Sequence, residues 1–444
     1  MVHGPPASRR RASAAHRPYA WPGLDRAFYL QVAALAATAE GRALAASLDR
    51  RDAAARPSRP MGLPLRLRPG LRCELDAFVA AYHRMIETIV AAYPHDARLR
   101  QVLTIPEPLR AELASARDEK VHLLRLDLMP QPDGGLRVLE TNANCPGGLS
   151  RSGLSQAAWR PLLTEHGIGL PAPLPSESEL WTGRWLVDLA EGHTGRRPHT
   201  VAVLCPRGAN HNDVHAYGVS LARLGIRALH GDPRELRAGE AGGVVLRGKP
   251  VHHAFAKIGM QDLLRMSGEL QPYLRAVREE SLFVQNGLRG RVIGDNKLCL
   301  AVLSDPQFAD LFAPEDCRRV RPSVPWSRNI AGCDATTVRQ IIGDRNRYVL
   351  KRPLDTRGHG VIVGKEIADD AAWGEAVGRA IEEGWLVQEY CSAPQIRTDP
   401  DLPPARHDLE LGVVSGRLAF AFVRVGHEER LNTARSGRVH PLYL

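Results

Sequence analysis

The polar residues with the most informative spacing lie in a short predicted β-hairpin. Its turn signal is Pro132–Gly135, which reads Pro-Asp-Gly-Gly. Folding the flanking strands about this turn places Asp127 opposite Glu140 and Arg125 opposite Asn142. Because side chains alternate along a strand, each strand presents its two polar residues on one face.

Asp127 and Glu140 would repel each other across the hairpin. A cation bound between them would compensate this repulsion, so the pair is a candidate metal site. Carboxylate and amide oxygens with spare water positions suit magnesium, which usually also takes phosphate oxygens. We therefore predict Asp127, Glu140 and Asn142 as metal ligands. The alternatives are a polar face that is merely solvated, or a register that differs by one residue.

Two lysines are candidates for phosphate binding. The chain uses only six lysines among its 59 basic residues, so a lysine can mark a place that needs a compact charge. Lys297 is predicted to open a helix after a strand. Lys351 lies near a strand end, before the glycine-rich loop Arg357–Gly360. Such loops let backbone amides approach phosphates, although no P-loop pattern closes this one. A plain turn and a solvent-facing lysine are the alternatives.

The stretch Val387–Cys391 is predicted to be a strand whose end exposes backbone N–H and C=O groups. Such groups can contact the edge of an adenine ring, and Glu389 could accept a hydrogen bond from a ribose hydroxyl. Glu389 could equally pair with a surface arginine.

Two further groups are weaker candidates. Cys145 lies beside the predicted metal ligands, but no base is close to it in sequence, so we interpret it as a small buried residue. His252 and His253 are neighbours on a predicted strand and would point to opposite faces, which disfavours a shared metal.

Composition narrows the class of protein. With 444 residues, 44% hydrophobic and 24% charged, the chain can form two or three domains. The net charge of +10 could indicate a nucleic-acid partner. The charge is spread along the chain, however, and only 5% of residues are aromatic, so we expect no nucleic-acid partner. Seven scattered cysteines without a CxxC pair indicate a reduced, cytoplasmic protein. No long apolar run or secretory signal is recognisable, so no membrane partner is expected.

The elements that must position these residues follow from the hydrophobic pattern. Residues 24–117 are predicted to be helical, residues 55–70 a loop, and Gly169–Glu177 a Pro-rich linker. One apolar stripe at helical spacing is assigned to the core: Leu75, Phe78, Val79, Tyr82, Met85, Ile86, Ile89 and Val90.

Short strands alternate with helices after residue 199. Strands at 200–205, 226–230 and 243–247, with a helix at 213–224, predict a small α/β unit. The later predicted elements are strands at 282–286, 347–352, 361–364, 385–391, 408–414 and 418–425, and helices at 295–303 and 369–383.

Taken in order, these motifs resemble those of a known family over roughly residues 120–444. The matching residues are Arg125-x-Asp127, Glu140-x-Asn142 followed by Pro146, Asp295-Asn296-Lys297, Lys351 with Arg357-Gly358-x-Gly360-Val361, Gln388-Glu389-Tyr390, and Arg424 with Asn432-x-x-x-x-Gly437. The chain resembles the circularly permuted ATP-grasp ligases, which include the glutathionylspermidine synthetase-like enzymes. The acidic motif before the lysines is the permuted order.

The resemblance implies a role for each matching residue. Asp127, Glu140 and Asn142 would hold Mg²⁺ on the phosphates of ATP, while Arg125 and Arg424 would stabilise the transferred phosphoryl group. The implied nucleotide-binding residues are Arg125, Lys297, Lys351, Arg357, Gly358, Gly360, Gln388, Glu389, Tyr390 and Cys391. The loop Cys145–Ser155 and the His252–His253 region are expected near the substrates.

The expected fold is α+β: a circularly permuted ATP-grasp core with a small α/β domain and a helical N-terminal region. The expected parts are a disordered basic tail at 1–20, the helical region at 21–118, the hairpin and substrate loop at 119–195, the α/β domain at 196–290, and the nucleotide-binding subdomains at 291–444.

The implied reaction is ATP-dependent amide bond formation between a small-molecule or peptide carboxylate and an amine, through an acylphosphate. An ATP-grasp phosphotransferase and a non-catalytic nucleotide- or peptide-binding protein are the alternatives. The sequence names neither substrate nor oligomeric state.

Overall fold

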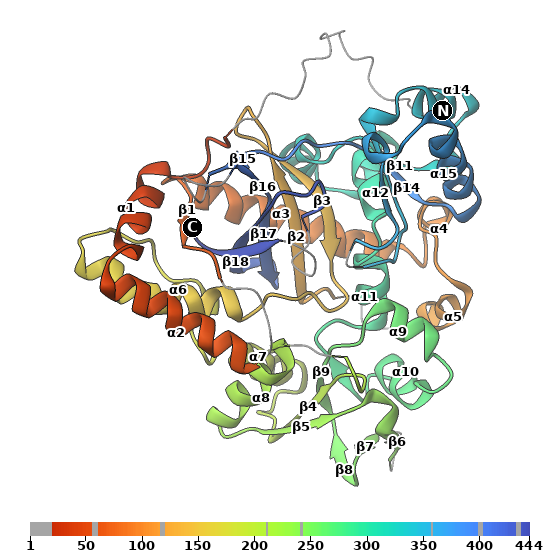
Figure 1. The fold of residues 1–444 in the computed structure, drawn as a ribbon. Helices are drawn as coiled ribbons and strands as arrows, with labels where there is room; N and C mark the ends of the chain where they lie inside the picture. Colours follow the sequence, from red (N-terminus) through yellow and green to blue (C-terminus); the bar gives the residue numbers. More distant parts are fainter. Residues whose placement is uncertain are drawn as a thin grey trace.

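The computed structural model describes residues 20–55, 61–115, 120–209, 212–239, 243–356, 358–397, 403–431 and 437–444. Helices and strands alternate around several separate sheets, so the fold is mixed α+β (Figure 1). The helices are α1 Arg26–Ala36, α2 Ala39–Ala55, α3 Leu71–Ala92, α4 Ala97–Val102, α5 Glu107–Ser115, α6 Arg151–Glu165, α7 Trp181–Thr194, α8 Asn212–Arg223, α9 Met260–Arg265, α10 Gln271–Arg278, α11 Leu288–Gly294, α12 Cys299–Ser304, α13 Pro314–Val320, α14 Ala335–Gly343 and α15 Asp370–Glu383.

The largest sheet combines strands from distant parts of the chain in the order β1-β19-β18-β17-β2-β3, with β16 and β15 attached beside β18. Its strands are β1 Leu65–Arg66, β2 Leu123–Pro130, β3 Leu136–Asn142, β15 Gln395–Ile396, β16 Ala405–His407, β17 Leu409–Val414, β18 Arg417–Gly426 and β19 Arg438–Tyr443. We call it the main sheet.

The predicted hairpin register is confirmed. Strands β2 and β3 pair antiparallel, with Asp127 opposite Glu140 and Arg125 opposite Asn142. The register shifts between Asp127 and Leu128, where the structure has a β-bulge that the sequence did not indicate. The pairs next to the turn, Leu128–Val138 to Pro130–Leu136, are one residue out of step with the polar pairs, so the bulge and the turn together set the pairing of Asp127 with Glu140.

The predicted α/β unit contains a four-stranded sheet in the order β10-β9-β4-β5, in which all neighbouring strands are parallel. Its strands are β4 Thr200–Leu204, β5 Arg227–Gly231, β9 His253–Ala256 and β10 Phe283–Val284. A small antiparallel sheet is inserted between β5 and β9, made of β6 Leu236–Ala238, β7 Val244–Leu246 and β8 Lys249–Val251. These elements lie at the bottom of Figure 1.

A second four-stranded sheet, which we call the lysine sheet, has the antiparallel order β11-β14-β12-β13. Its strands are β11 Ser327–Asn329, β12 Tyr348–Lys351, β13 Val361–Val363 and β14 Leu386–Glu389. Helices α14 and α15 pack on it around a core that contains Trp373 and Tyr348. The strands 347–352, 361–364 and 385–391 and the helix 369–383 were predicted here, with ends that differ by one or two residues.

The apolar stripe of α3 is confirmed as core, because all eight predicted residues are buried. The helix packs against α11 and α13, so α3, α4 and α5 share one hydrophobic core with the middle of the chain, whereas α1 packs in a separate cluster with α6. No helix among the described residues is long and apolar enough to span a membrane. The predicted domain boundaries remain predictions, and the predicted tail at 1–20 lies outside the described residues except for its last residue.

Three predicted elements need correction. The segment 55–70 is not all loop, because Leu65 and Leu67 are buried and β1 pairs with the C-terminal strand β19. The segment Cys145–Ser155 is only partly a loop, because α6 begins at Arg151 and buries Trp159. The helix predicted from 295 begins at Cys299 after α11, so Lys297 lies in an interhelical turn rather than after a strand.

The packing of α6 leads to a stability prediction. A Cβ atom on Gly153 would lie 2.1 Å from the backbone oxygen of Ser176, so Gly153→Ala must displace main chain. We expect a loss of about 1–3 kcal/mol in stability. The matched control is Gly378→Ala in α15, where a Cβ meets nothing within 4 Å, and where we expect a gain of up to about 1 kcal/mol. Thermal unfolding of both variants measures the difference; equal melting temperatures would contradict the close contact of α6 with Ser176.

Candidate functional site

The acidic pair of the hairpin extends into a row of three carboxylates. Strand β17 pairs with β2 on the side away from β3, and this places Glu410 opposite Asp127. Glu140, Asp127 and Glu410 therefore lie on three adjacent strands. Like charges in such a row repel, so the cations beside them decide whether the sheet is stable.

Two arginines neutralise the inner part of this row. Arg125 Nε lies 2.9 Å from Asp127 Oδ1 and 2.8 Å from Glu410 Oε2. Arg424, on β18, places Nη2 at 2.6 Å from both Glu410 Oε1 and Asp408 Oδ2, and at 3.1 Å from Asp127 Oδ2. The acids that contact these arginines, Asp127, Asp408 and Glu410, are all buried, with exposed fractions of 4% or less. Three acids therefore share two guanidinium groups inside the protein.

The carboxylates of this cluster respond differently to their environment. Burial alone would raise the pKa of Asp127, but the charges of Arg125 and Arg424 lower it below its ordinary value. Burial raises the pKa of Glu410 well above its ordinary value and also raises the pKa of Asp408. The cluster has one acid more than it has guanidinium groups, so repulsion from the neighbouring carboxylates adds to burial in raising the pKa values of Asp408 and Glu410.

Asn142 completes the hairpin side of the site. Its Nδ2 donates a 2.9 Å hydrogen bond to Asp127 Oδ1, which leaves its carbonyl oxygen as the group that could act as a metal ligand. Among the described residues, no group of three or more His, Cys, Asp or Glu side chains has an arrangement that could hold a metal ion. The metal role of Asp127, Glu140 and Asn142 thus remains a prediction.

Both predicted lysines are buried and donate to β3. Lys297 Nζ lies 2.9 Å from Glu140 Oε1 and donates to the carbonyl of Asp355. Lys351 Nζ donates to the Leu139 carbonyl at 2.8 Å and to Gln388 Oε1 at 2.7 Å. Through these bonds the lysine sheet is joined to the hairpin of the main sheet, so the solvent-facing alternative does not hold for either lysine.

The two ammonium groups differ in protonation. Burial lowers the pKa of Lys297, but the nearby carboxylates of Glu140 and Asp295 outweigh it and raise the pKa above its ordinary value. Burial lowers the pKa of Lys351 to about 8, because Glu140 offsets it only in part. Lys351 can therefore change charge close to neutral pH.

A third buried lysine was missed by the sequence analysis. Lys257 Nζ donates to the carbonyls of Cys145 and Pro146 at 2.8 and 2.7 Å, and lies 3.5 Å from Asp213 Oδ2. Lys257, Lys297 and Lys351 all bind the stretch of chain between residues 139 and 146. The scarcity of lysine in the sequence was the signal that could have singled it out.

The strand predicted to bind adenine is an interior strand of the lysine sheet, not an edge strand. Strand β14 lies between β11 and β12, and the N–H groups of Glu389 and Tyr390 already donate to the carbonyls of Trp326 and Arg347. Those two N–H groups are therefore not open to an adenine edge. Gln388 is turned inward, with its Nε2 donating to Ser327 Oγ at 3.1 Å.

The side chains at the end of β14 also have protein partners. Glu389 is half exposed and lies 3.6 Å from Arg347, which is the surface pairing that the sequence left open. The Tyr390 hydroxyl binds Glu429 and the ammonium of Lys365. Burial raises the pKa of the Cys391 thiol to about 12, so this cysteine is not a reactive thiolate.

The glycine-rich loop connects β12 and β13 as a hairpin, which was the alternative interpretation. Gly358 and Gly360 have φ angles of +74° and +65°, and the Arg352 N–H donates to the Gly360 carbonyl at 2.8 Å. A Cβ on Gly360 would lie 2.7 Å from Arg352 Cβ, so the loop needs glycine there for space as well as for conformation. Arg357 and Asn432 lie outside the described residues.

Asp408 and Glu410 were also missed. Their signal was an Asp-x-Glu pair at the start of a strand that is otherwise apolar. Asp295 has a structural role, because its carboxylate accepts the N–H groups of Ala143 and Asn144 at 2.7 and 2.9 Å. Cys145 is half-buried with its Sγ near the Ile258 carbonyl, and His252 is exposed while His253 is buried, as expected.

Comparison with known proteins supports the fold alone. No protein-family model matches the chain, and no curated protein sequence matches it significantly. A glutathione synthetase-like effector from Globodera pallida, solved in its apo form, superposes with a TM-score of 0.60 at 14% identity, over 87% of this chain and 91% of that one. A putative gamma-glutamylcysteine synthetase from Methylobacillus flagellatus aligns over 82% and 88% at 14% identity, but its TM-score of 0.42 carries no argument. The chain thus has a fold like that of a glutathione synthetase-like protein.

The arginine–carboxylate cluster gives a second stability prediction. Arg424→Met would leave three buried carboxylates with one guanidinium, and we expect a loss of about 3–5 kcal/mol. The control is Arg72→Met, which removes a partly exposed ion pair to Asp76 in α3 and should cost about 0.5 kcal/mol. Thermal unfolding at neutral pH compares them. An Arg424→Met protein as stable as the control would mean that the cluster does not form as described.

The pKa of Lys351 gives a pH prediction. Between about pH 8 and its ordinary value of 10.5, the unfolded chain holds a proton on Lys351 that the folded chain has released. The contribution of Lys351 to stability therefore rises with pH across this window, by up to about 3 kcal/mol. The melting temperature of the wild type minus that of Lys351→Met should increase from pH 8 to 10.5. The corresponding difference for Lys249→Met, which changes an exposed lysine, should stay constant. A constant difference for Lys351→Met as well would refute the lowered pKa of Lys351.

Proposed function

We propose that this protein is an ATP-dependent ligase that joins a carboxylate to an amine through an acylphosphate, on an ATP-grasp core with motifs in permuted order. The observation that carries the proposal is that buried cations and buried carboxylates from two sheets converge on one hairpin. A purely structural core rarely buries so many charges, because each must be compensated. The fold likeness to a glutathione synthetase-like protein agrees with it.

The arrangement supports an exchange of partners when substrates bind. Each proposed phosphate-binding cation is already held on a proposed metal ligand or its neighbour: Lys297 on Glu140, and Arg125 and Arg424 on Asp127. The phosphates of ATP would pair with the lysine and arginine side chains. The carboxylates that these side chains contact now would then be free to bind a metal ion. Binding of ATP would thus exchange one set of ion pairs for another.

The residues present suit magnesium, because they combine carboxylate and amide oxygens beside phosphate-binding cations. Asp127, Glu140 and Asn142 would hold the ion, which supplies charge neutralisation to the phosphate oxygens when bound. Lys297 and Lys351 would bind the α- and β-phosphates. Arg125 and Arg424 would stabilise the charge that develops on the transferred phosphoryl group.

The proposed chemistry has two steps. A carboxylate oxygen of the first substrate attacks the γ-phosphorus of ATP, and the bond to the β,γ-bridging oxygen breaks, which releases ADP. The amine nitrogen of the second substrate attacks the acyl carbon, the C–O bond to phosphate breaks, and phosphate and a proton leave. The protein supplies orientation and charge, and none of its own side chains acts as a nucleophile.

The test is ADP release measured with pairs of amino acids or short peptides and amines, with mass spectrometry of the products. We expect ADP formation that needs a carboxylate and an amine together. Asp127→Asn and Lys297→Met should each lower the rate at least about 100-fold, since each removes a charge of the phosphate site. The control Lys249→Ala removes an exposed lysine in β8 and should retain full activity.

Two results would overturn the proposal. ADP formation without an amine, with a stable phosphorylated product, would identify a phosphotransferase. Nucleotide or peptide binding without turnover for any pair, with circular dichroism showing a folded protein, would identify a binding protein. Full activity of both Asp127→Asn and Lys297→Met would remove the site assignment.

A further inference from the structure

A groove follows one face of α7. Three cavities of about 1080, 430 and 340 Å³ lie along this helix. The first is lined by Trp181, Arg184, Trp185 and Asp188 of α7, and the second by Asp188, Leu189, Gly192 and His193. These residues recur at intervals of three and four, so they form one continuous stripe on the helix.

Neighbouring cavities also share their other walls. The β17–β18 hairpin contributes Val414 and Leu418 to the first cavity and Ser415 to the second. The second and third share His193, Glu280 and Phe283. Since α7 has 14 residues, the groove is about 20 Å long. This length corresponds to about six residues of extended chain.

The first part of the groove is apolar and aromatic. Trp181 and Trp185 stack with their ring centroids 6.5 Å apart, and Leu418 and Ala419 belong to the same lining. Part of the polar lining is already satisfied, because Arg160 pairs with Glu177 at 2.7 Å. This end can therefore accept a large apolar side chain.

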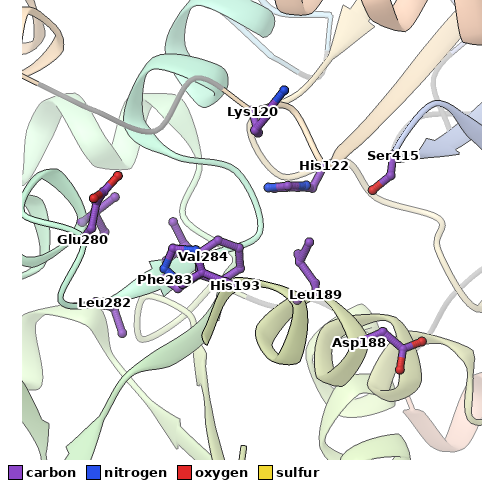
Figure 2. A pocket seen from close by; sticks show the side chains of 12 residues that line it. Lys120, His122, Asp188, Leu189, His193, Glu280, Leu282, Phe283, Val284 and Ser415 are labelled. Carbon is purple, nitrogen blue, oxygen red and sulfur yellow. The ribbon is translucent and has the colours of Figure 1, made fainter. Parts of the chain in front are cut away.

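The second part has a mixed lining that includes two carboxylates and Lys120, whose Nζ lies 4.0 Å from Glu87. Figure 2 shows His122, Leu189 and the stacked His193 and Phe283 around the same space. Burial lowers the pKa of His122 to about 4, so its ring is neutral at pH 7. Asp188 and Glu280 are exposed at the edges of this part. The two carboxylates outnumber Lys120, which is itself close to Glu87, so a positively charged side chain is the better complement of this part and a phosphate backbone the poorer one.

We propose that this groove docks an extended peptide of about six residues, with an aromatic or large apolar side chain against Trp185 and a lysine or arginine beside Asp188 and Glu280. The proposal does not depend on ligase activity. The apolar end of the groove is separate from the candidate site: Leu418, in its wall, and Arg424 are about 20 Å apart along β18, while His122 in the second part lies about 10 Å along the chain from Arg125.

Gly192 permits a test that fills the groove without opening a cavity. It lines the second cavity, and a Cβ there would meet nothing within 4 Å. Gly192→Phe should fold normally, because its Cβ meets no atom and glycine is a poorer helix former than phenylalanine. Its ring should then fill the groove. The matched control is Gly378→Phe in α15, also exposed, with nothing within 4 Å of its Cβ and outside these cavities.

The experiment measures fluorescence anisotropy of labelled hexapeptides with the full-length protein at low salt. The probes are Phe-Ala-Ser-Ala-Lys-Ala, its counterpart with Glu in place of Lys, and its counterpart with Ser in place of Phe. We expect the first to bind, with each change weakening binding at least fivefold. Gly192→Phe should weaken it at least tenfold, and Asp188→Asn should remove most of the preference for Lys over Glu, whereas Gly378→Phe and Glu191→Gln should not.

Other outcomes would overturn the proposal. One is no saturable binding of the first probe at millimolar concentration; another is equal affinity for the Lys and Glu peptides. A third is a dimer in sedimentation velocity that Gly192→Phe dissociates, which would assign this face to a second copy of the chain. Equal binding by Gly192→Phe and the wild type would place the peptide elsewhere.

Discussion

The compensation of buried charge at the centre of the main sheet is the interaction on which the rest of the structure depends. Asp127 on β2, Glu410 on β17 and Arg424 on β18 are each buried, and none is tolerable without the others. Asp127 and Arg424 are 297 residues apart in sequence. The hairpin that carries the candidate metal ligands is therefore electrostatically complete only when the C-terminal strands lie beside it.

The contacts between the lysine sheet and the hairpin are of another kind. Lys297 and Lys351 reach β3 through a carboxylate and a carbonyl oxygen, which are acceptors that anionic oxygens can replace. Lys257 holds the following residues from the α/β unit in the same way. The main sheet, the lysine sheet and the α/β unit thus meet at one short stretch of chain through ammonium groups. A change in the partners of these ammonium groups would alter the contacts between all three parts.

Local signals predicted much of this arrangement, and long-range pairing accounts for what they missed. The turn at Pro132–Gly135 was enough to predict that Asp127 and Glu140 lie opposite each other, but in the structure this pairing also needs the one-residue bulge between them and the turn. Glu410 belongs to that row only because β17 pairs with β2. The residues of neither strand indicate this long-range pairing. The same holds for β14, which ends in a protected interior position that its own residues do not reveal.

The strand order of the main sheet has a consequence for synthesis of the chain. Strand β19, residues 438–443, lies between β1 and β18 rather than at an edge, and β1 is only residues 65–66. A ribosome releases β1 long before β19, so β1 lacks its neighbour in the sheet until β19 has been made. β2 can pair with β3 at once, but Asp127 lacks Glu410 and Arg424 until β17 and β18 have been made, which makes a late, slow closure with high contact order the natural course of folding.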